Sequence, residues 1–396
     1  MKMQKPKVRF KGFTDDWEQR KLEELVGIYD GVHQTPDYQD SGIMFLSVEN
    51  IATIKSEKYI SEEAFERDYK VYPEKGDILM TRIGDVGTTN VVETAEKVAF
   101  YVSLALLKPN EIDSYFLSNA MKTNAFQKGL RERTLVTAIP QKINKDEIGK
   151  IDIFITNNDE EQKKIGAYFS NLDHLITFHQ RKCEQTKKLK KYMLQKMFPK
   201  EGQTVPEVRF EGFTDAWEKR KFGDLGSVSM CRRIFKEQTA TEGDIPFYKI
   251  GTFGGEPDAF ISRALFEEYK EKYQYPEVGD MLISASGTIG RTVEYAGEDA
   301  YFQDSNIVWF KHDDRVDNSF LKCIYSSVKW SGIEGSTIKR LYNDNFLKTE
   351  FSMPNAEEQK KIGEYFQNLD HFITLHQRKC DELQNIKKFM LQNMFI

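Results

Sequence analysis

The sequence predicts a mixed α/β protein in which two domains alternate with two long helices that form an antiparallel coiled coil. The first observation is length, because 396 residues and 46.2 kDa exceed one ordinary hydrophobic core. The second is an internal repeat: residues 6–25 match residues 206–225 at 13 of 20 positions, and residues 159–198 match residues 356–395 at 27 of 40 positions. The third is that the segments between these repeats diverge, although short strands and glycine-rich turns recur in both.

The repeat gives the expected order of the domains. Residues 1–155 form a first variable domain and residues 156–200 a long central helix, and residues 201–353 and 354–396 repeat this pair. Blocks of about 150 residues have a normal domain size. An internal pseudo-twofold repeat with diverged blocks indicates two equivalent structural units that do the same job on two different ligands.

Each variable block contains similar short elements. The apolar runs 77–81 (DILMT) and 280–284 (DMLIS) predict buried strands, and each leads into a glycine-rich loop. Residues 61–72 and 262–273 predict short helices. Residues 114–130 predict one longer helix. The blocks are therefore expected to be mixed α/β domains.

The two near-identical segments predict long helices. Asn158 with Glu161, and Asn355 with Glu358, fit an N-cap residue followed by a glutamate that reaches back to the cap. Apolar residues then recur in steps of four and three, which is the spacing of a coiled-coil seam. The seam residues are Ile165, Phe169, Leu172 and Ile176 in the first copy and Ile362, Phe366, Leu369 and Ile373 in the second. Because each copy carries one principal stripe, we expect the helices to pack against each other rather than to lie as unrelated amphipathic helices on the surface.

The formal charge is close to balanced, since 57 basic and 62 acidic side chains give a net charge of −5 and a pI near 5.9. This excludes a protein coated with basic charge, although local basic excesses occur in residues 122–150 and 180–200. No apolar run approaches the ~18 residues of a membrane span. The first residues lack the apolar core of a secretory signal, and four scattered cysteines do not suggest a disulfide framework. We expect a cytoplasmic protein without membrane contact.

Motifs for catalysis are missing from the sequence. It contains no P-loop, no complete G-x-G-x-x-G loop, and no Asn-Pro-Pro or Asp-Pro-Pro motif of amino-methyltransferases. Pro257 and Asp258, followed by Glu268 and Lys270, fit the spacing of a Mg²⁺-dependent nuclease centre. The last two fall in an expected helix, whereas such nucleases place them on a strand. We therefore expect no catalytic residue in this chain.

A zinc site is the second chemistry that the sequence allows. His179 with Cys183, and His376 with Cys380, lie one helical turn apart, so paired helices could bring two histidines and two cysteines together. Duplication of the seam explains the same pattern more simply, because these residues were copied with it. The C-x-x-C spacing of many zinc sites is also missing, so we expect no metal.

Basic and polar side chains around the glycine loops suit a nucleic-acid surface. Arg and Lys bind guanine edges or phosphates, Gln reads adenine, and glycine lets a backbone approach DNA closely. The pattern recurs at matched places in both blocks, which favours a binding surface. In the first block the candidates are Arg82, Gly84, Thr88, Lys128, Arg131, Arg133, Gln141 and Lys142. In the second block they are Arg232, Arg233, Tyr248, Lys249, Ser286, Thr288, Arg291, Ser336, Thr337, Lys339 and Arg340.

Over essentially its whole length, the chain resembles the specificity (S) subunit of type I restriction–modification systems, the HsdS family. The resemblance rests on F-x-G-F-T-D-x-W-E-x-R-K at 10–21 and 210–221, and on E-E-Q-K-K-I-G-x-Y-F-x-N-L-D-H-x-I-T at 160–177 and 357–374. The two glycine loops are also similar to loops of this family. Arg82 in the first loop corresponds to Ala285 in the second, so the two loops cannot make the same contact.

The resemblance implies a non-catalytic subunit. Each variable block is then a target recognition domain that reads one half of a bipartite, asymmetric site in double-stranded DNA. The helices set the spacer between the half-sites and dock two modification (M) subunits. S-adenosylmethionine for adenine methylation belongs to the M subunits, and ATP and Mg²⁺ belong to partners that include restriction (R) subunits, so this chain needs no cofactor. Two alternatives stay open: a stand-alone Mg²⁺-dependent nuclease and a coiled-coil protein scaffold.

Overall fold

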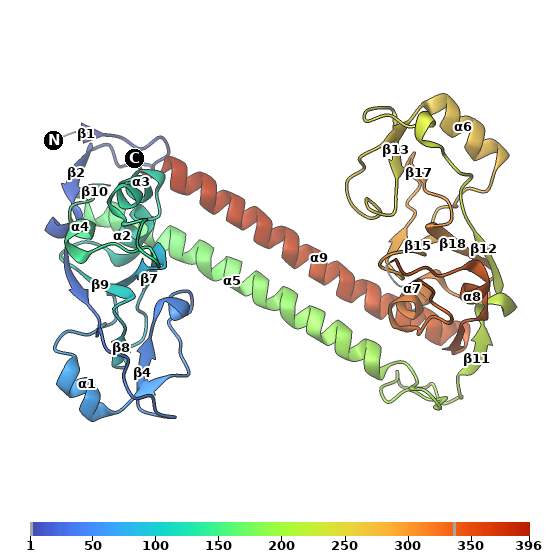
Figure 1. The fold of residues 1–396 in the computed structure, drawn as a ribbon, viewed down its shortest axis with the longest axis horizontal. Coiled ribbons are helices and arrows are strands. Elements are labelled where there is room, and N and C mark those ends of the chain that lie inside the picture. Colours follow the sequence, from blue (N-terminus) through green and yellow to red (C-terminus); the bar gives the residue numbers. More distant parts are fainter. Residues whose placement is uncertain (1–2, 336–337) are drawn as a thin grey trace. The chain divides into compact units, whose positions relative to one another are not determined.

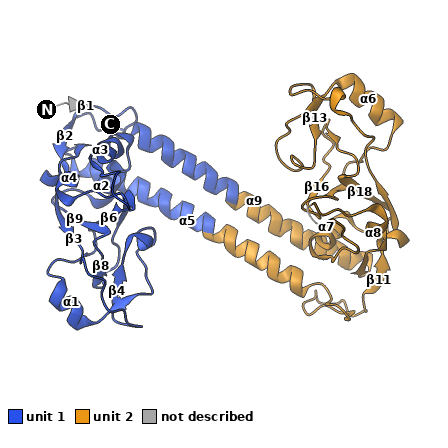
Figure 2. Cartoon of the chain, viewed as in Figure 1, with its two compact units in different colours: residues 1–180, 377–396 blue, residues 181–376 orange. Residues whose placement is uncertain are grey.

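The computed structural model describes residues 3–335 and 338–396, which fold into two compact units (Figure 2). Unit 1 consists of residues 1–180 and 377–396, and unit 2 consists of residues 181–376. The predicted domain limits follow the repeat in the sequence, whereas these units divide both long helices. The domain limits therefore stay a prediction.

Two long helices occupy the duplicated segments, as expected. Helix α5 covers Asp159–Lys196 and helix α9 covers Ala356–Asn393 (Figure 1). Unit 1 contains the first part of α5 and the last part of α9, and unit 2 contains the remaining parts. Within each unit the start of one helix packs against the end of the other, so the two helices are antiparallel there. The mixed α/β fold class with an antiparallel helix pair is confirmed.

The helix pair is closed by an apolar seam in each unit. The predicted seam residues of unit 1 share one core with the end of α9, and those of unit 2 share another core with the end of α5. All of them are at most 8% exposed, apart from the half-buried Ile373. Their partners are Cys380, Leu383 and Met394 in unit 1, and Met193, Leu194 and Met197 in unit 2.

Three small sheets are described in unit 1 (Figure 1). The largest has four antiparallel strands in the order β3 (Val26–Asp30), β9 (Leu104–Pro109), β6 (Ile78–Ile83) and β7 (Asp85–Val91). The second pairs a central strand with one antiparallel and one parallel neighbour, in the order β5 (Tyr59–Ile60), β4 (Ile43–Leu46) and β8 (Val98–Phe100). The third is antiparallel, in the order β1 (Met3–Gln4), β2 (Trp17–Lys21) and β10 (Asp152–Ile155).

Strand β6 explains why its sequence is a continuous apolar run. Successive side chains of a strand point to opposite faces of the sheet. Ile78 and Met80 face the core that contains the long helices, and Leu79 faces a second core beneath β4, β8 and the short helix α1 (Glu62–Asp68). A strand that is buried on both faces has no solvent side for polar residues.

The longer helix predicted over 114–130 is wrong, because this region holds two helices. Helix α2 covers Ser114–Ala120 and helix α3 covers Asn124–Arg133. Thr123 separates them with an extended backbone, and its side chain accepts a hydrogen bond from the amide of Phe126. A capping threonine starts a new helix and cannot continue the previous one. The short helix α4 (Lys145–Gly149) completes unit 1.

Unit 2 repeats this plan in its described residues. Its largest sheet is antiparallel, in the order β12 (Gly226–Ser229), β18 (Ile307–His312), β15 (Met281–Ser284) and β16 (Thr292–Glu294). A second sheet has the order β14 (Phe260–Ile261), β13 (Ile245–Tyr248) and β17 (Tyr301–Phe302), with β17 parallel to β13. A two-stranded sheet joins β11 (Glu218–Lys221) to β19 (Glu350–Met353). The matching strand orders confirm the internal repeat.

The helices of unit 2 follow the same scheme. Helix α6 covers Arg263–Lys272, α7 covers Asn318–Ser327 and α8 covers Asn343–Lys348. The side chain of Asp317 caps α7 by accepting hydrogen bonds from the amides of Ser319 and Phe320. Among the described residues, no helix is both long enough and apolar enough to span a membrane.

Candidate nucleic-acid interface

Strand β6 turns tightly into β7 at Gly84, and we name this turn, with the first residues of β7, glycine loop 1 (residues 84–87). Gly84 and Gly87 have φ values of +82° and +104°, which L side chains rarely adopt. A β-carbon on Gly87 would lie 2.2 Å from a methyl group of Leu130, so the helix α3 packs closely on this loop. The loop therefore requires glycine both for its backbone and for its contact with α3.

A short hairpin, hairpin 1 (residues 135–142), lies against glycine loop 1. Leu135 and Lys142 exchange backbone hydrogen bonds that close the hairpin. The amide of Gly84 donates to the carbonyl of Gln141 at 2.9 Å, and the side-chain amide of Gln141 donates back to the carbonyl of Gly84 at 2.9 Å. Glycine loop 1, which follows β6 directly, is thus held to a hairpin whose Gln141 lies 57 residues after Gly84 in the sequence.

Helix α3 brings basic side chains to the same place. Gln127 of α3 donates to the carbonyl of Gly87 at 3.2 Å. On this helix, Lys128 and Arg131 are exposed, and Arg133 is half-buried. Together with Gly84, Thr88, Gln141 and Lys142, these candidates lie in or next to segments that contact one glycine loop. The structure therefore gathers most of the candidate residues of unit 1.

Arg82 lies apart from these exposed candidates. Its side chain is buried, with 6% of the residue exposed, and it forms an ion pair with Asp30. Burial lowers the pKa of Arg82, and its buried Nε has no hydrogen-bond partner among the described residues. In this structure Arg82 anchors Asp30 of β3 to β6, and its role in DNA contact stays a prediction.

Unit 2 holds an equivalent loop and hairpin. Glycine loop 2 (residues 287–290) has positive φ values of +66° and +91° at its two glycines. The amide of Gly287 donates to the carbonyl of Lys339 at 2.9 Å. Hairpin 2 (described residues 334–335 and 338–340) is closed by backbone hydrogen bonds between Glu334 and Arg340. The candidates Ser336 and Thr337 lie outside the described residues.

A turn between β17 and β18 (residues 303–306) connects the candidates of unit 2. Asn306 accepts hydrogen bonds from the hydroxyl of Ser286 at 2.8 Å and from Nη2 of Arg340 at 3.3 Å. Asp304 forms an ion pair with Arg233 at 2.8 Å. Ser286, Arg340 and Arg233 come from three different segments, so this turn brings them to one edge of the unit.

The other candidates of unit 2 lie around this edge with individual partners. The guanidinium of Arg232 lies 5.3 Å from the ring centre of Tyr273, and Arg291 donates to the carbonyl of Phe253 at 2.8 Å. Lys249 forms an ion pair with Asp258 at 2.7 Å. Tyr248 stacks on Phe302, and Thr288 and Lys339 are exposed. A pocket of about 480 Å³ is lined by Arg232, Arg233, Tyr273 and Asp304.

The described residues offer little for hydrolysis. No group of three or more His, Cys, Asp or Glu side chains in this part of the chain could hold a metal ion. Glu268 and Lys270 lie on helix α6 rather than on a strand, and Glu268 pairs with Lys272 at 3.1 Å. Burial also raises the pKa values of Cys231 and Cys323 to about 12, which keeps both thiols protonated at neutral pH.

Sequence reasoning missed a feature that we name the helix-end clamp. In unit 1, Nε and Nη2 of Arg9 donate to the two carboxylate oxygens of Glu161 at 2.5 and 2.8 Å, at the start of α5. The amide of the neighbouring Val8 donates to the carbonyl of Asn393, at the end of α9, at 2.9 Å. Residues 8–9 therefore join the start of one long helix to the end of the other.

The clamp corrects the capping prediction. Asn158 does accept from the amide of Glu161 at 3.1 Å, but the glutamate side chain binds Arg9 and does not reach back to the cap. The second copy is the same: Asn355 caps α9, and Glu358 binds Arg209 at 2.7 and 2.8 Å. The sequence Val-Arg-Phe, which is identical in both repeats at 8–10 and 208–210, could have indicated this contact.

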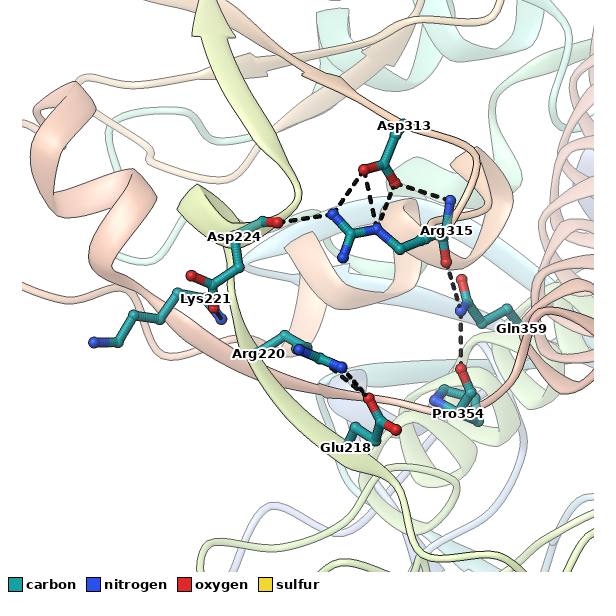
Figure 3. A network of polar contacts seen from close by, with 8 residues as sticks. All are labelled: Glu218, Arg220, Lys221, Asp224, Asp313, Arg315, Pro354 and Gln359. Atoms are coloured by element: carbon teal, nitrogen blue, oxygen red, sulfur yellow. Dashed lines mark hydrogen bonds and ion pairs between the residues drawn. The ribbon is translucent and has the colours of Figure 1, made fainter.

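Gln359, the next residue of α9, extends the clamp of unit 2 (Figure 3). Its side-chain amide donates to the carbonyls of Arg315 and Pro354 at 3.0 and 2.9 Å. Arg315 in turn binds the Asp313 carboxylate and donates to the carbonyl of Asp224 at 2.8 Å. The start of α9 is thus fixed to two loops of the adjoining α/β domain.

A second missed feature is an apolar stripe of partly exposed residues on each long helix, outside the seam. We name these residues the outer stripe. Between 36% and 56% of each residue is exposed, and each α9 member lies 197 positions after its α5 counterpart. The members are Leu175, Phe178, Leu189 and Tyr192 on α5, and Phe372, Leu375, Ile386 and Phe389 on α9. Only the seam was predicted from the sequence, as one principal stripe in each copy, so the outer stripe was not expected.

Comparison with known proteins follows the same division into two repeats. The sequence model of the type I restriction modification DNA specificity domain matches residues 14–188 and 214–385. The chain belongs to this family. Each match contains one variable block with its glycine loop and most of the long helix that follows. The identification made from the duplicated motifs is therefore confirmed.

Individual relatives of this DNA specificity family differ in how much they share with the chain. A Haemophilus influenzae protein named as a type I restriction enzyme specificity subunit is 58% identical over 156 residues, which are 39% of this chain and 40% of that protein. The chain thus spans about two fifths of that relative. A Methanocaldococcus jannaschii protein named as the MjaX specificity subunit is 23% identical over 412 residues, covering 94% of this chain and 91% of that protein.

The fold has a relative among solved structures. The crystal structure of a type I restriction–modification S subunit from M. genitalium has a TM-score of 0.68 and covers 99% of both chains. The two sequences are 15% identical. At this low identity the likeness shows the fold alone.

Proposed function

We propose that this chain is the non-catalytic DNA-reading subunit of a type I restriction–modification complex. Unit 1 and unit 2 each read one half of a bipartite site in double-stranded DNA, through the glycine loop, the hairpin and the basic residues around them. Because the two reading surfaces carry different side chains, the site is asymmetric. Two identical surfaces related by a twofold axis would read a palindrome.

The main support is a shared backbone arrangement with diverged side chains. In both units a glycine amide binds the carbonyl of a hairpin residue at 2.9 Å, Gly84 to Gln141 and Gly287 to Lys339. The residue that follows is Lys142 in hairpin 1 and Arg340 in hairpin 2. A shared backbone arrangement that carries different polar side chains suits the reading of different DNA sequences, since side chains hydrogen-bond to base edges in the major groove.

The outer stripe supports the docking of two modification subunits. Each unit exposes four of its large apolar side chains, at positions that are equivalent in the repeat. Exposed apolar side chains that recur at helical spacing favour a protein interface. Two equivalent surfaces would bind two copies of one partner. S-adenosylmethionine, ATP and Mg²⁺ would then be bound by the modification and restriction subunits.

The long helices would set the distance between the half-sites. The clamp fixes both helix ends in each unit, and the seam fixes how the helices pack there. A change in helix length would then change the spacer between the two half-sites, with little effect on the bases that each unit reads.

The proposed function is tested by identifying the DNA sequence that is methylated by a complex of this chain with a modification subunit. Sequencing of methylated adenines in cells that express both proteins should give one bipartite, asymmetric motif. Replacing residues 27–155 with the block of another family member should change one half of the motif only. A simultaneous change in both halves would refute separate reading.

Two further measurements distinguish the scaffold and nuclease alternatives. A scaffold would bind its protein partners without any preference among DNA sequences. A nuclease would cut DNA when the isolated chain is incubated with Mg²⁺, and Glu268→Ala would abolish the cutting. Either result would overturn the proposed function.

A further inference from the structure

We propose that Ile139, in hairpin 1, is a specificity-determining residue that contacts the C5-methyl group of a thymine in the major groove. This inference rests on the proposed function and names one feature of the first half-site. It assigns a base contact to a residue that carries no charge and no hydrogen-bonding group in its side chain.

The exposure of Ile139 is the first observation. Its side chain is 100% exposed, and the nearby Val136 is 68% exposed. Removing a large aliphatic side chain from water stabilises a protein by roughly 1.5–3 kcal/mol, so folding gains nothing from an isoleucine at this position. An exposed aliphatic residue is common on its own, but this one lies within the candidate interface.

The second observation is how firmly the hairpin is joined to the fold. The hydrogen bonds between Leu135 and Lys142 close it, and the amide of Ile143 donates to the carbonyl of Arg82 at 3.0 Å. The bonds between Gln141 and Gly84 add the glycine loop. Ile139 therefore projects from a loop with both ends fixed to β6 and to glycine loop 1.

Unit 2 shows the same combination in a diverged sequence. Ile338 of hairpin 2 is 67% exposed and comes just before Lys339, whose carbonyl accepts the bond from Gly287. Two blocks with little identity thus both present an exposed isoleucine beside the glycine loop. The recurrence favours a shared task over an accident of one sequence.

The surroundings indicate DNA rather than an apolar protein surface. Lys142 is an exposed residue of hairpin 1, and exposed Lys128 and Arg131 lie on α3, which contacts glycine loop 1 through Gln127. These cations suit phosphates. The thymine methyl group is the apolar feature that base pairs present in the major groove, and aliphatic side chains contact it there. A branched aliphatic side chain among cations therefore matches a thymine next to the DNA backbone.

The experiment measures binding of the complete complex to the duplex identified by methylome sequencing. Each thymine of the first half-site is replaced in turn by deoxyuridine, which lacks only the methyl group. For the natural protein, one replacement should weaken binding about fourfold, the equivalent of ~0.8 kcal/mol for one buried methyl group. Ile139→Ala should weaken binding to the unmodified duplex to a similar degree and should be insensitive to that same replacement.

Two controls separate the outcomes. Ile139→Val loses the terminal methyl group but keeps both γ-carbons, so it should retain more of the deoxyuridine effect than Ile139→Ala. Ile338→Ala should leave the deoxyuridine effect in the first half-site unchanged. Equal sensitivity of the natural protein and Ile139→Ala, or no sensitive thymine, would overturn this inference while half-site reading stands. Loss of modification-subunit binding by Ile139→Ala with normal DNA binding would also overturn it. Absence of any sequence preference would refute the proposed function itself.

Discussion

The guanidinium of Arg9 binds both carboxylate oxygens of Glu161 at the first turn of α5, and Glu161 is fully buried. Arg9 is 152 residues away in the sequence, so this contact joins the start of the chain to the first long helix. The pair sits where the long helix meets the α/β domain. A change here is therefore expected to disturb the attachment of helix to domain.

Breaking this pair should be strongly destabilising. Arg9→Met leaves a buried carboxylate without a partner, which typically costs about 3–5 kcal/mol. Urea unfolding followed by circular dichroism measures the effect. Arg20→Met is the matched control, because Arg20 pairs with Glu18 and Glu24 in contact with solvent, and the loss of these pairs should destabilise much less. Equal losses in both variants would contradict the role of the clamp.

Lys122, in the segment between α2 and α3, predicts a pH dependence of stability. Burial, with repulsion from Lys387, lowers the pKa of Lys122 to about 8. An unfolded lysine titrates near pH 10.4, so between these values the unfolded chain binds more protons and stability rises with pH. We expect a rise of about 1–2 kcal/mol between pH 7.5 and 9.5 in the free energy of unfolding.

A pair of variants isolates this effect. Lys122→Met removes the titrating group and should flatten the rise in urea unfolding measured over the same pH range. Lys128→Met removes an exposed lysine of the same unit and should leave the rise in place. A rise that persists unchanged without Lys122 would assign it to other groups.

The outer stripe should govern the number of modification subunits bound. Leu175→Asp places a charge on the stripe of unit 1 and should release one of two copies, because a charge in an apolar interface is costly to desolvate. Adding Phe372→Asp, the equivalent change in unit 2, should release both. Native mass spectrometry counts the bound copies, and Glu184→Ser serves as a control on another face of α5. Retention of both copies by the double variant would exclude the stripe from docking.

Arg340 should contribute to reading the second half-site. Its guanidinium is bound to Asn306 and lies 5.9 Å from the ring centre of Tyr342, which holds it beside glycine loop 2. Arg340→Ala should weaken binding of the cognate duplex by about 1–3 kcal/mol, as expected for loss of a base contact. Fluorescence anisotropy gives the affinity, and Lys272→Ala on α6 is the control. Unchanged affinity would place Arg340 outside the interface.

Helix length should control the spacer. Insertion of one heptad at matching registers in α5 and α9 would lengthen each by about 10 Å. The methylated motif should then gain about three base pairs between unchanged half-sites, since base pairs repeat every ~3.4 Å. A motif with the original spacer would refute the helices as its ruler.

The repeated parts of the fold could be predicted because duplication marks them. Both long helices and the strands β6 and β15 were found from the periodicity and from the apolar runs, which report burial directly. Sequence could not locate the break at Thr123, because its cap competes with a strong helical pattern on both sides. It also could not choose between Asn158 and Arg9 as the partner of Glu161, since the deciding contact spans 152 residues.

The candidate surface was predicted in composition but only in part in position. Gly84 and Gln141 were both predicted to belong to one binding surface, and they are hydrogen-bonded to each other in the structure. Arg82 was predicted to lie in the glycine loop, but it lies on β6 and its buried side chain binds Asp30. The residues around Arg82 in the sequence do not indicate this inward orientation. The outer stripe escaped notice because the seam accounts for the stronger apolar pattern.

The aromatic ring of Phe395 has a consequence for how the protein is made. It lies 5.5–5.8 Å from the rings of Trp17, Phe116 and Phe169 in unit 1, whereas Phe198 fills the corresponding place beside Trp217 in unit 2. During translation Phe198 emerges before most of unit 2, so that unit can acquire its core as it leaves the ribosome. Unit 1 lacks the ring of Phe395 until the whole of unit 2 has been synthesised, so its aromatic core is the later of the two to be completed.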